Sequence, residues 1–166
     1  MHKYFLLLIL SMLIGSATVS AQKYGNALGL RADGQTLGIL YKHRVMDTHT
    51  VDGLLAFNSY ESYLKGSYNI HKKILSKSLN YYVGAGGHIG RHEISGGYVG
   101  ADLTLGLEFK LPVLPVLAAV DVNPAFHIGR EDNVQILTGL SVLYVINTER
   151  DVRKSKRAKK SIFRRS

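Results

Sequence analysis

The chain of 166 residues contains no cysteine, so no disulfide can hold its fold together. It also lacks a long apolar run, since no segment reaches the roughly 20 continuous apolar residues that a transmembrane helix requires. Helical periodicity is poor, and many of the 17 glycines recur inside the apolar segments, where they would weaken a helix. These deficits argue against a helical membrane protein, and they favour a closed β-sheet as the source of stability.

The first residues have the pattern of a secretory signal peptide. A short basic start precedes the apolar run Tyr4–Ile14, and the small, polar stretch Ser16–Ala21 follows it. We therefore expect residues 1–21 to be a signal peptide that is cleaved before Gln22. Because no cysteine follows that point, we expect no lipid anchor at the mature N-terminus.

The net charge of +9 belongs mainly to the C-terminal end of the chain. Residues 148–166 hold nine Lys or Arg and two acids, and Lys3 adds one further positive charge. Residues 22–147 are therefore nearly neutral, with eleven bases against ten acids. We expect residues 148–166 to be a basic periplasmic tail that is either solvated and disordered or in contact with anionic lipid headgroups. The signal peptide argues against a nucleic-acid partner for this Lys/Arg-rich segment.

The clearest pattern in the chain is the alternation of residue types through Gly97–Lys110. Apolar residues such as Val99 and Leu103 fall on one face, and Asp102 and Glu108 fall on the other. Alternate side chains of a β-strand point to opposite faces. The segment therefore needs an apolar medium on one side and a polar one on the other, as a strand of a membrane barrel has.

The same test finds eight expected strands separated by short turns. They are Lys23–Arg31, Thr36–Arg44, Thr50–Ser59, Ser62–His71, Leu79–Gly90, Gly97–Lys110, Val116–Gly129 and Val134–Ile146. Eight strands of about ten residues match the smallest transmembrane barrels. We predict an all-β fold over residues 22–147, a closed eight-stranded antiparallel up-and-down transmembrane barrel with short loops. The even strand number places both chain ends on one side, which for an outer membrane is the periplasm.

Alternation also assigns the strand residues to two faces. The expected lipid-facing set contains no charge and has several aromatics near strand ends, where interfacial girdles lie. It comprises Leu28, Leu30, Leu37, Ile39, Tyr41, Val51, Leu55, Phe57, Leu64, Tyr68, Ile70, Tyr81, Val83, Ile89, Val99, Leu103, Leu105, Leu107, Phe109, Val120, Val122, Phe126, Leu140, Val142 and Tyr144.

The opposite face mixes acids and bases. Because an eight-stranded barrel is just wide enough for side chains to fill, charges inside it must be paired or hydrogen-bonded. We predict a filled, non-conducting lumen held by a structural network of four acids and four bases. The acids are Asp52, Asp102, Glu108 and Asp121, and the bases are Lys42, Arg44, Lys65 and Lys110.

Several segments resemble the small outer-membrane β-barrel proteins of Bacteroidetes-type bacteria, which are similar in architecture to OmpX and OmpA-type barrels. The segments are NALGLR, TLGILYKHR, LNYYVGAGGHIG, GGYVGADLTLGLEFKLPVLP, AAVDVNPAF and TGLSVLYVI. The resemblance implies a fold and a location in the outer membrane, and it carries over no catalytic residues. Such barrels usually stop at an aromatic of the last strand, whereas 22 residues follow Tyr144 here.

The histidines could serve as metal ligands. His88 and His92 have the four-residue spacing of a helical metal pair, but on a strand that runs into a turn they need not converge. We expect His88 and His127 to act as hydrogen-bonding groups in the lumen, and we expect no metal or cofactor.

Two further groups have the residue types of a catalytic site. His92, Glu93 and Ser95 could supply base, orienter and nucleophile in the turn before Gly97–Lys110, but a polar turn is the simpler interpretation. Glu108 and Asp121 could form an acid–base carboxylate pair, but a structural ion network explains them more simply. No catalytic residue is therefore assigned.

The sequence favours a non-enzymatic outer-membrane barrel with a structural or surface role, whose partners are outer-membrane lipid and the barrel assembly machinery. Two alternatives stay open. One is a barrel enzyme, an acyltransferase or deacylase, that modifies lipid A or phospholipid. The other is a soluble periplasmic ligand-binding barrel of the lipocalin type, which would need the apolar face inward and the charged face outward.

Overall fold

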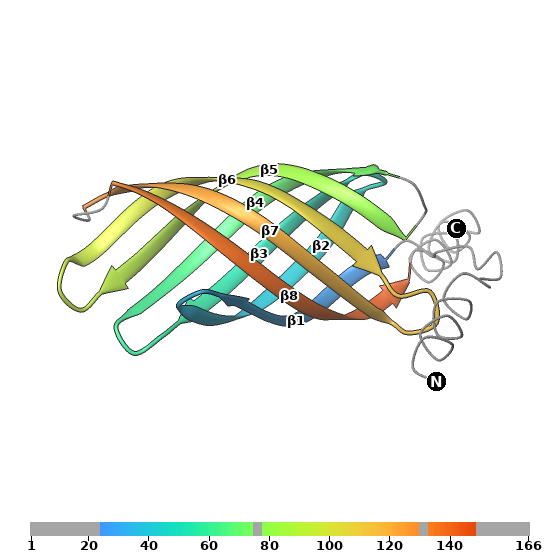
Figure 1. Cartoon of the computed structure of the whole chain (residues 1–166), viewed down its shortest axis with the longest axis horizontal. Coiled ribbons are helices and arrows are strands. Elements are labelled where there is room, and N and C mark those ends of the chain that lie inside the picture. The colour runs from blue at the N-terminus through green and yellow to red at the C-terminus, as the bar shows by residue number, and fades with distance from the viewer. Residues whose placement is uncertain (1–23, 75–77, 130–132, 149–166) are drawn as a thin grey trace, which may run out of the picture.

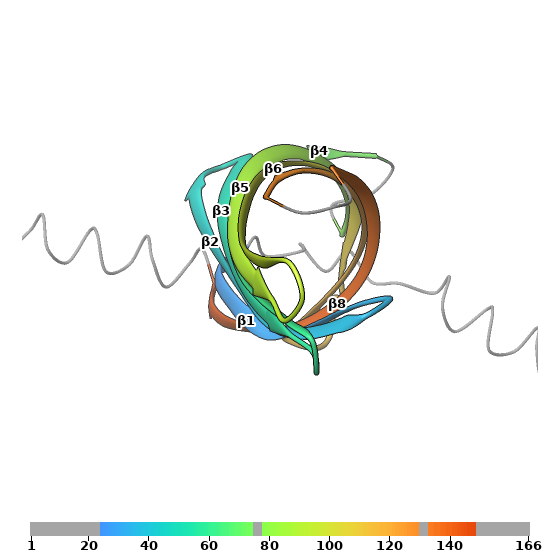
Figure 2. The same cartoon turned by 90° about the vertical axis from the view of Figure 1, so that its left-hand side faces the viewer.

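The computed structural model describes residues 24–74, 78–129 and 133–148. Within these ranges the strands are β1 (Tyr24–Asp33), β2 (Thr36–Met46), β3 (His49–Phe57), β4 (Glu61–Lys73), β5 (Leu79–His92), β6 (Gly96–Lys110), β7 (Val116–Ile128) and β8 (Val134–Thr148). Each strand pairs antiparallel with the next, and β8 pairs with β1, which closes the barrel (Figures 1 and 2). The predicted closed, eight-stranded, up-and-down architecture is confirmed. The expected signal peptide and almost all of the expected tail lie outside the described residues.

The strands follow the predicted segments closely, and the differences are at their ends. Four of them, β2, β5, β7 and β8, begin at the predicted residue, while β4 and β5 each run two residues past their predicted ends. Cross-strand pairing extends these ends, because Glu61 pairs with His92 and Lys73 with Asn80. No helix that is long and apolar enough to span a bilayer occurs in the described part of the chain.

The two faces of the sheet are separated as the alternation predicts. Leu103, Leu105 and Leu107 of β6 are exposed on the outer surface, whereas Asp102 and Glu108 are buried in the lumen. Every residue of the predicted lipid-facing set is exposed except Tyr81, which is half-buried. The apolar face therefore points outward around the whole barrel.

The barrel has two unlike ends. At the proximal end the chain enters β1 and leaves β8; the distal end carries the turns β1–β2, β3–β4, β5–β6 and β7–β8. The strands β5 and β6 have 14 and 15 residues, whereas β1 and β2 have 10 and 11. The β5–β6 hairpin accordingly reaches further at the distal end than the β1–β2 hairpin does (Figure 1).

Strand β1 begins with a bulge where it pairs with β8. The register shifts between Tyr24 and Asn26 and again between Asn26 and Ala27. A bulge inserts an extra residue and turns the side chains before it to the other face. Tyr24 and Ala27 are therefore both buried in the lumen, although they are three residues apart.

Candidate functional site

The candidate site is the lumen, which is lined by polar and charged side chains from all eight strands. Its buried polar residues include Arg31, Asp33, Thr36, Lys42, Thr50, Asp52, Asn69, His71, His88, Asp102, Thr104, Glu108, Asp121, Asn123, His127 and Ser141. Their ion pairs form three clusters along the barrel, named here proximal, central and distal.

The proximal cluster surrounds Glu108 of β6, whose side chain is fully buried. Lys42 Nζ lies 3.3 Å from Glu108 Oε2 and 3.3 Å from Asp52 Oδ2, so one ammonium bridges two carboxylates. Tyr24 donates its hydroxyl hydrogen to Glu108 Oε2 at 3.0 Å, and Asn69 donates to Asp52 Oδ2 at 2.9 Å. Hydrogen bonds of this kind offset part of the cost of burying charge.

The central cluster is built around a bidentate ion pair between β1 and β7. Both terminal nitrogens of Arg31 donate to the Asp121 carboxylate at 2.7 Å. Tyr82 donates to Asp121 Oδ2 at 2.7 Å, and Asn123 donates to Asp121 Oδ1. The planar guanidinium matches the carboxylate with two parallel bonds, which fixes both side chains over Gly139 of the intervening strand β8.

The distal cluster joins β4, β5 and β6. Lys65 Nζ lies 3.3 Å from Asp102 Oδ1 and donates to Asn123 Oδ1 at 2.9 Å. His88 Nδ1 lies 2.7 Å from Asp102 Oδ2. Asn123 also bonds to Asp121 of the central cluster. The distal and central clusters are therefore one continuous network.

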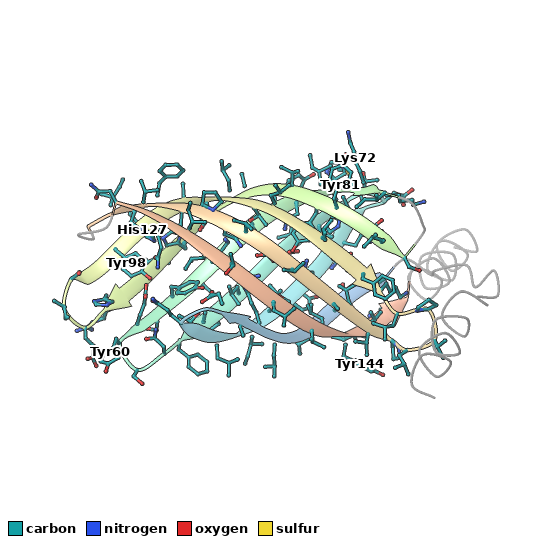
Figure 3. The ribbon with its side chains drawn as sticks, viewed as in Figure 1. Tyr60, Lys72, Tyr81, Tyr98, His127 and Tyr144 are labelled. Atoms are coloured by element: carbon teal, nitrogen blue, oxygen red, sulfur yellow. The ribbon has the colours of Figure 1, made fainter. Side chains whose placement is uncertain are left out.

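Two pairs of aromatic and acidic side chains lie beyond this cluster, nearer the distal mouth. Tyr63 donates to Asp33 Oδ2 at 2.8 Å, and Tyr98 donates to Glu61 Oε1. Figure 3 shows Tyr98 and His127 inside this end of the barrel.

The expected network of four acids and four bases is present in part. Lys42 meets Asp52 and Glu108, and Lys65 meets Asp102. Asp121, however, pairs with Arg31, which was not among the four expected bases. The remaining expected bases, Arg44 and Lys110, lie half-buried on β2 and β6 near the proximal end.

Arg44 makes contacts other than the expected ion pair. Its guanidinium lies 4.6 Å from the centroid of the Tyr24 ring, and its Nη1 donates to the Asp47 backbone carbonyl at 2.9 Å. The bulge in β1 brings the Tyr24 ring to this place. Arg44 thus packs on the Tyr24 ring near the proximal end of the barrel.

Glycines make room for these large side chains. In the register of the sheet, Gly106 lies between Tyr82 and Asp121. A Cβ atom on Gly106 would be 2.6 Å from Tyr82 Oη and 2.7 Å from Asp121 Cβ. The hydrogen bond between Tyr82 and Asp121 therefore forms over a residue without a side chain.

The structure does not bring together the side chains of either alternative catalytic group. His92 Nδ1 lies 3.3 Å from the Ile94 backbone nitrogen, which donates to it across the β5–β6 turn. No side-chain hydrogen bond in the described structure joins His92, Glu93 and Ser95, and Glu93 is exposed. Glu108 and Asp121 lie in different clusters, each with its own base.

His88 and His92 do not form a metal pair either. They face the same way on β5 but are four residues apart, a distance of about 13 Å along an extended strand. Among the described residues, no group of three or more His, Cys, Asp or Glu side chains could hold a metal ion.

Two of the cavities in the described part of the chain lie beside these clusters. The distal cavity holds about 470 Å³ of space free of protein atoms, with the solvent at its mouth included, and His88, His127, Tyr98 and Glu61 are among its lining residues. The other holds about 330 Å³ and is lined by residues that include Lys42, Asp52, Tyr82 and Asp121. The ion pairs lie in the walls of both cavities.

Sequence reasoning missed the partner of Asp121 and a row of apolar residues in the lumen. Arg31 faces inward by simple alternation, but its pairing with Asp121 depends on barrel closure between β1 and β8. An inward-facing apolar row on five neighbouring strands was also missed. It comprises Leu117, Leu143, Gly29, Leu40 and Leu54. Alternation on β2 and β8 could have found Leu40 and Leu143, because each lies between outward residues.

Comparison with known proteins yields a structural likeness only. No protein-family model matches the chain, and no curated protein matches it. The N-terminal β-barrel domain of Pseudomonas aeruginosa OprF matches with a TM-score of 0.62 at 12% identity, over 74% of this chain and 98% of that domain. A chain from a study of de novo designed transmembrane β-barrels matches with a TM-score of 0.49 at 15% identity, over 75% of this chain and 98% of its own length. The likeness to the OprF domain supports the barrel fold.

Proposed function

We propose that this protein is an integral barrel of a Gram-negative outer membrane, with a structural or surface role and no enzymatic activity. Both chain ends lie on the periplasmic side and the distal turns face outside. The observation that carries the proposal is the separation of the two faces, because the outer face of the strands is apolar and the charged residues in the middle of the strands are buried inside. A bilayer around the barrel accounts for this arrangement, because water would not stabilise an apolar outer surface of this extent.

The outer surface has the features of a lipid-facing belt. The strands contain 9 to 15 residues, enough to cross a bilayer when tilted. Figure 3 shows Tyr60 outside the distal end, and Tyr81 and Tyr144 outside nearer the proximal end. Aromatic residues at such levels suit the boundary between hydrocarbon and headgroups. Lys72, beside Tyr81 in the register, lies on the proximal rim, where a lysine reaches water.

This orientation is opposite to the one that a soluble lipocalin-type barrel needs. Such a barrel would hold its apolar face around a ligand and its charged face in water. Here Leu103 and Leu105 are 54% and 58% exposed, whereas Asp102 is 3% exposed. The arrangement of faces that a soluble lipocalin-type barrel requires is therefore reversed in this protein.

The filled lumen supports a barrel that does not conduct. Lys42 of β2 meets Glu108 of β6 across the interior, and Arg31 of β1 meets Asp121 of β7 over Gly139 of the intervening strand β8. An ion passing through would have to displace these paired charges in a medium of low polarity, which is costly.

Membrane fractionation tests the location. We expect the protein in the outer-membrane fraction, resistant to urea and carbonate extraction, with a gel mobility that changes on boiling as the barrel unfolds. Recovery in the soluble periplasm would overturn the proposal.

Planar-bilayer recording tests the lumen separately. We expect no stable single-channel current from the purified full chain. A reproducible single-channel conductance would refute the closed lumen while leaving the membrane location intact.

A further inference from the structure

Two histidines that are far apart in sequence meet at the distal end of the lumen. The register pairs His88 of β5 with Gly100 of β6, and Gly100 with His127 of β7. Because Gly100 has no side chain, the two imidazole rings approach each other over it, with centroids 4.8 Å apart. A Cβ atom on Gly100 would lie 2.5 Å from His88 Nε2. The contact between the two imidazole rings therefore requires glycine at position 100.

A hydrogen bond orients the ring of His88 through one nitrogen and leaves the other nitrogen without a hydrogen-bond partner among the described residues. Its Nδ1 lies 2.7 Å from Asp102 Oδ2, and Lys65 holds the other oxygen of that carboxylate at 3.3 Å. A carboxylate accepts hydrogen bonds, so Nδ1 carries the hydrogen and Nε2 of the neutral ring presents a lone pair. Nε2 is buried and has no hydrogen-bond partner in the described structure, and the side chain is only 4% exposed.

The surroundings of the two rings favour a cation. His88 and His127 both line the distal cavity, which also has the carboxylates of Asp33, Glu61 and Asp102 in its wall. Two bases, Arg31 and Lys65, line the same cavity. With neutral imidazoles the cavity wall therefore carries more negative than positive charge.

We propose that His88 and His127 bind a divalent transition-metal ion such as Cu²⁺, Ni²⁺ or Zn²⁺ in the distal cavity. Imidazole is a preferred ligand of these ions, and a histidine that binds a metal usually donates its second ring nitrogen to a carboxylate, as His88 does to Asp102. Two protein donors leave the other coordination positions to water from the cavity. The proposal does not depend on the location or conductance of the barrel.

The spacing of the rings fits this assignment. With metal–nitrogen bonds of about 2.0–2.1 Å and an angle of about 90–110° at the metal, two imidazole centroids lie roughly 4.5–5.2 Å apart. The observed 4.8 Å falls inside this interval. An ion between the rings would also give His88 Nε2 the partner that it lacks within the protein.

Copper binding to the purified full chain, without a histidine tag, tests the site. We expect one Cu²⁺ to bind per chain, with an electron paramagnetic resonance spectrum that shows two nitrogen ligands. His88→Gln and His127→Gln should each weaken binding about tenfold or more, and Asp102→Asn about 10-fold to 100-fold through loss of the orienting hydrogen bond. His92→Gln, on the same strand as His88, is the matched control and should bind like the unaltered chain.

Other outcomes would overturn the site. Absence of one-to-one binding, or equal binding by His88→Gln and the unaltered chain, refutes the proposal, as does loss of binding in His92→Gln alone. A further measurement uses only the unaltered chain, so it still tests the site if a variant fails to fold. With ¹⁵N-labelled histidines, Zn²⁺ should shift the ring-nitrogen resonances of two histidines and Mg²⁺ should shift none. A spectrum that Zn²⁺ leaves unchanged also refutes the proposal.

Discussion

Glycines on the inner and outer surfaces of this barrel occupy opposite surroundings. A Cβ atom on inward-facing Gly106 would collide with Tyr82 and Asp121, and one on Gly100 would collide with His88. Outward-facing Gly53 and Gly66, which pair with each other on β3 and β4, have no protein atom within 4 Å of such a Cβ. At these glycines the inner surface has no room for one more atom, whereas the outer surface leaves space for a fluid medium to fill.

This difference teaches how the two faces tolerate change. In the lumen, a large polar side chain depends on a specific partner and on the space beside a neighbouring glycine. Both removal and addition of atoms should therefore lower the free energy of unfolding. On the outer surface, which we propose to face lipid, only apolarity should matter, because lipid adapts to any shape. The following predictions separate these two requirements.

The largest loss is expected from Asp121→Ala. The substitution leaves Arg31 buried without its bidentate partner, a change that costs about 3–5 kcal/mol in the free energy of unfolding. Urea titration followed by gel mobility measures the loss. The double variant Arg31→Met with Asp121→Leu should lose less than Asp121→Ala alone, because no charge is left unpaired. A greater loss in the double variant would show that the ion pair itself stabilises the barrel.

A charged residue on the outer surface in the middle of a strand should destabilise the barrel. Leu103 lies at the centre of β6 and is 54% exposed, so Leu103→Arg should cost about 2–4 kcal/mol if lipid surrounds it. Ile94→Arg, at an 85% exposed position of the β5–β6 turn, is the control and should change little. Unfolding titrations in lipid vesicles give both values. Equal, small effects would contradict a lipid-facing β6.

A single methyl group should destabilise the lumen. Gly106→Ala places a Cβ atom 2.7 Å from Asp121 Cβ, and we expect the overpacking to lower the free energy of unfolding by about 1–3 kcal/mol. The same titration measures it. A neutral result would show that Tyr82 and Asp121 can shift without loss.

The same methyl group on the outer surface should have the smallest effect. Gly66→Ala meets nothing within 4 Å, and alanine loses less backbone entropy on folding than glycine. We expect the free energy of unfolding to stay unchanged or to rise by up to about 1 kcal/mol. Comparison with Gly106→Ala tests the same substitution on the two faces, so the only intended difference is the face on which the methyl group lies. Equal destabilisation by both variants would contradict the difference between the two surfaces.

The sequence predicts the strands and their faces well because each is a local property. Alternation in Gly97–Lys110 places Asp102 and Glu108 on one side and Leu103 on the other without reference to any partner. The structure has the same division. Barrel closure also follows from the pattern, because eight two-faced strands cannot all bury their polar side in an open sheet.

The pairing of charges could not be predicted in the same way. Lys42 and Glu108 are 66 residues apart, and Arg31 and Asp121 are 90 residues apart. Whether such residues meet depends on strand register and on the tilt that closes the barrel. Arg31 was consequently left out of the expected network, and Arg44 was expected to meet an acid but covers the Tyr24 ring.

The bulge in β1 is a second feature that alternation cannot show. Counting back from Leu28 by twos places Tyr24 on the outer surface, but the shifted register turns it inward, where it donates to Glu108. The contact between His88 and His127 has a similar origin, because it needs Gly100 between them on a neighbouring strand.

The amino-acid order alone settles that this chain forms strands with one apolar and one charged face, since a period of two acts within each strand. Tertiary structure decides which charges pair, which histidines meet and which tyrosine enters the lumen. The physical reason is that these contacts are made between different strands of the closed sheet. The distances between their atoms depend on strand register, on bulges and on glycines that leave space beside large side chains.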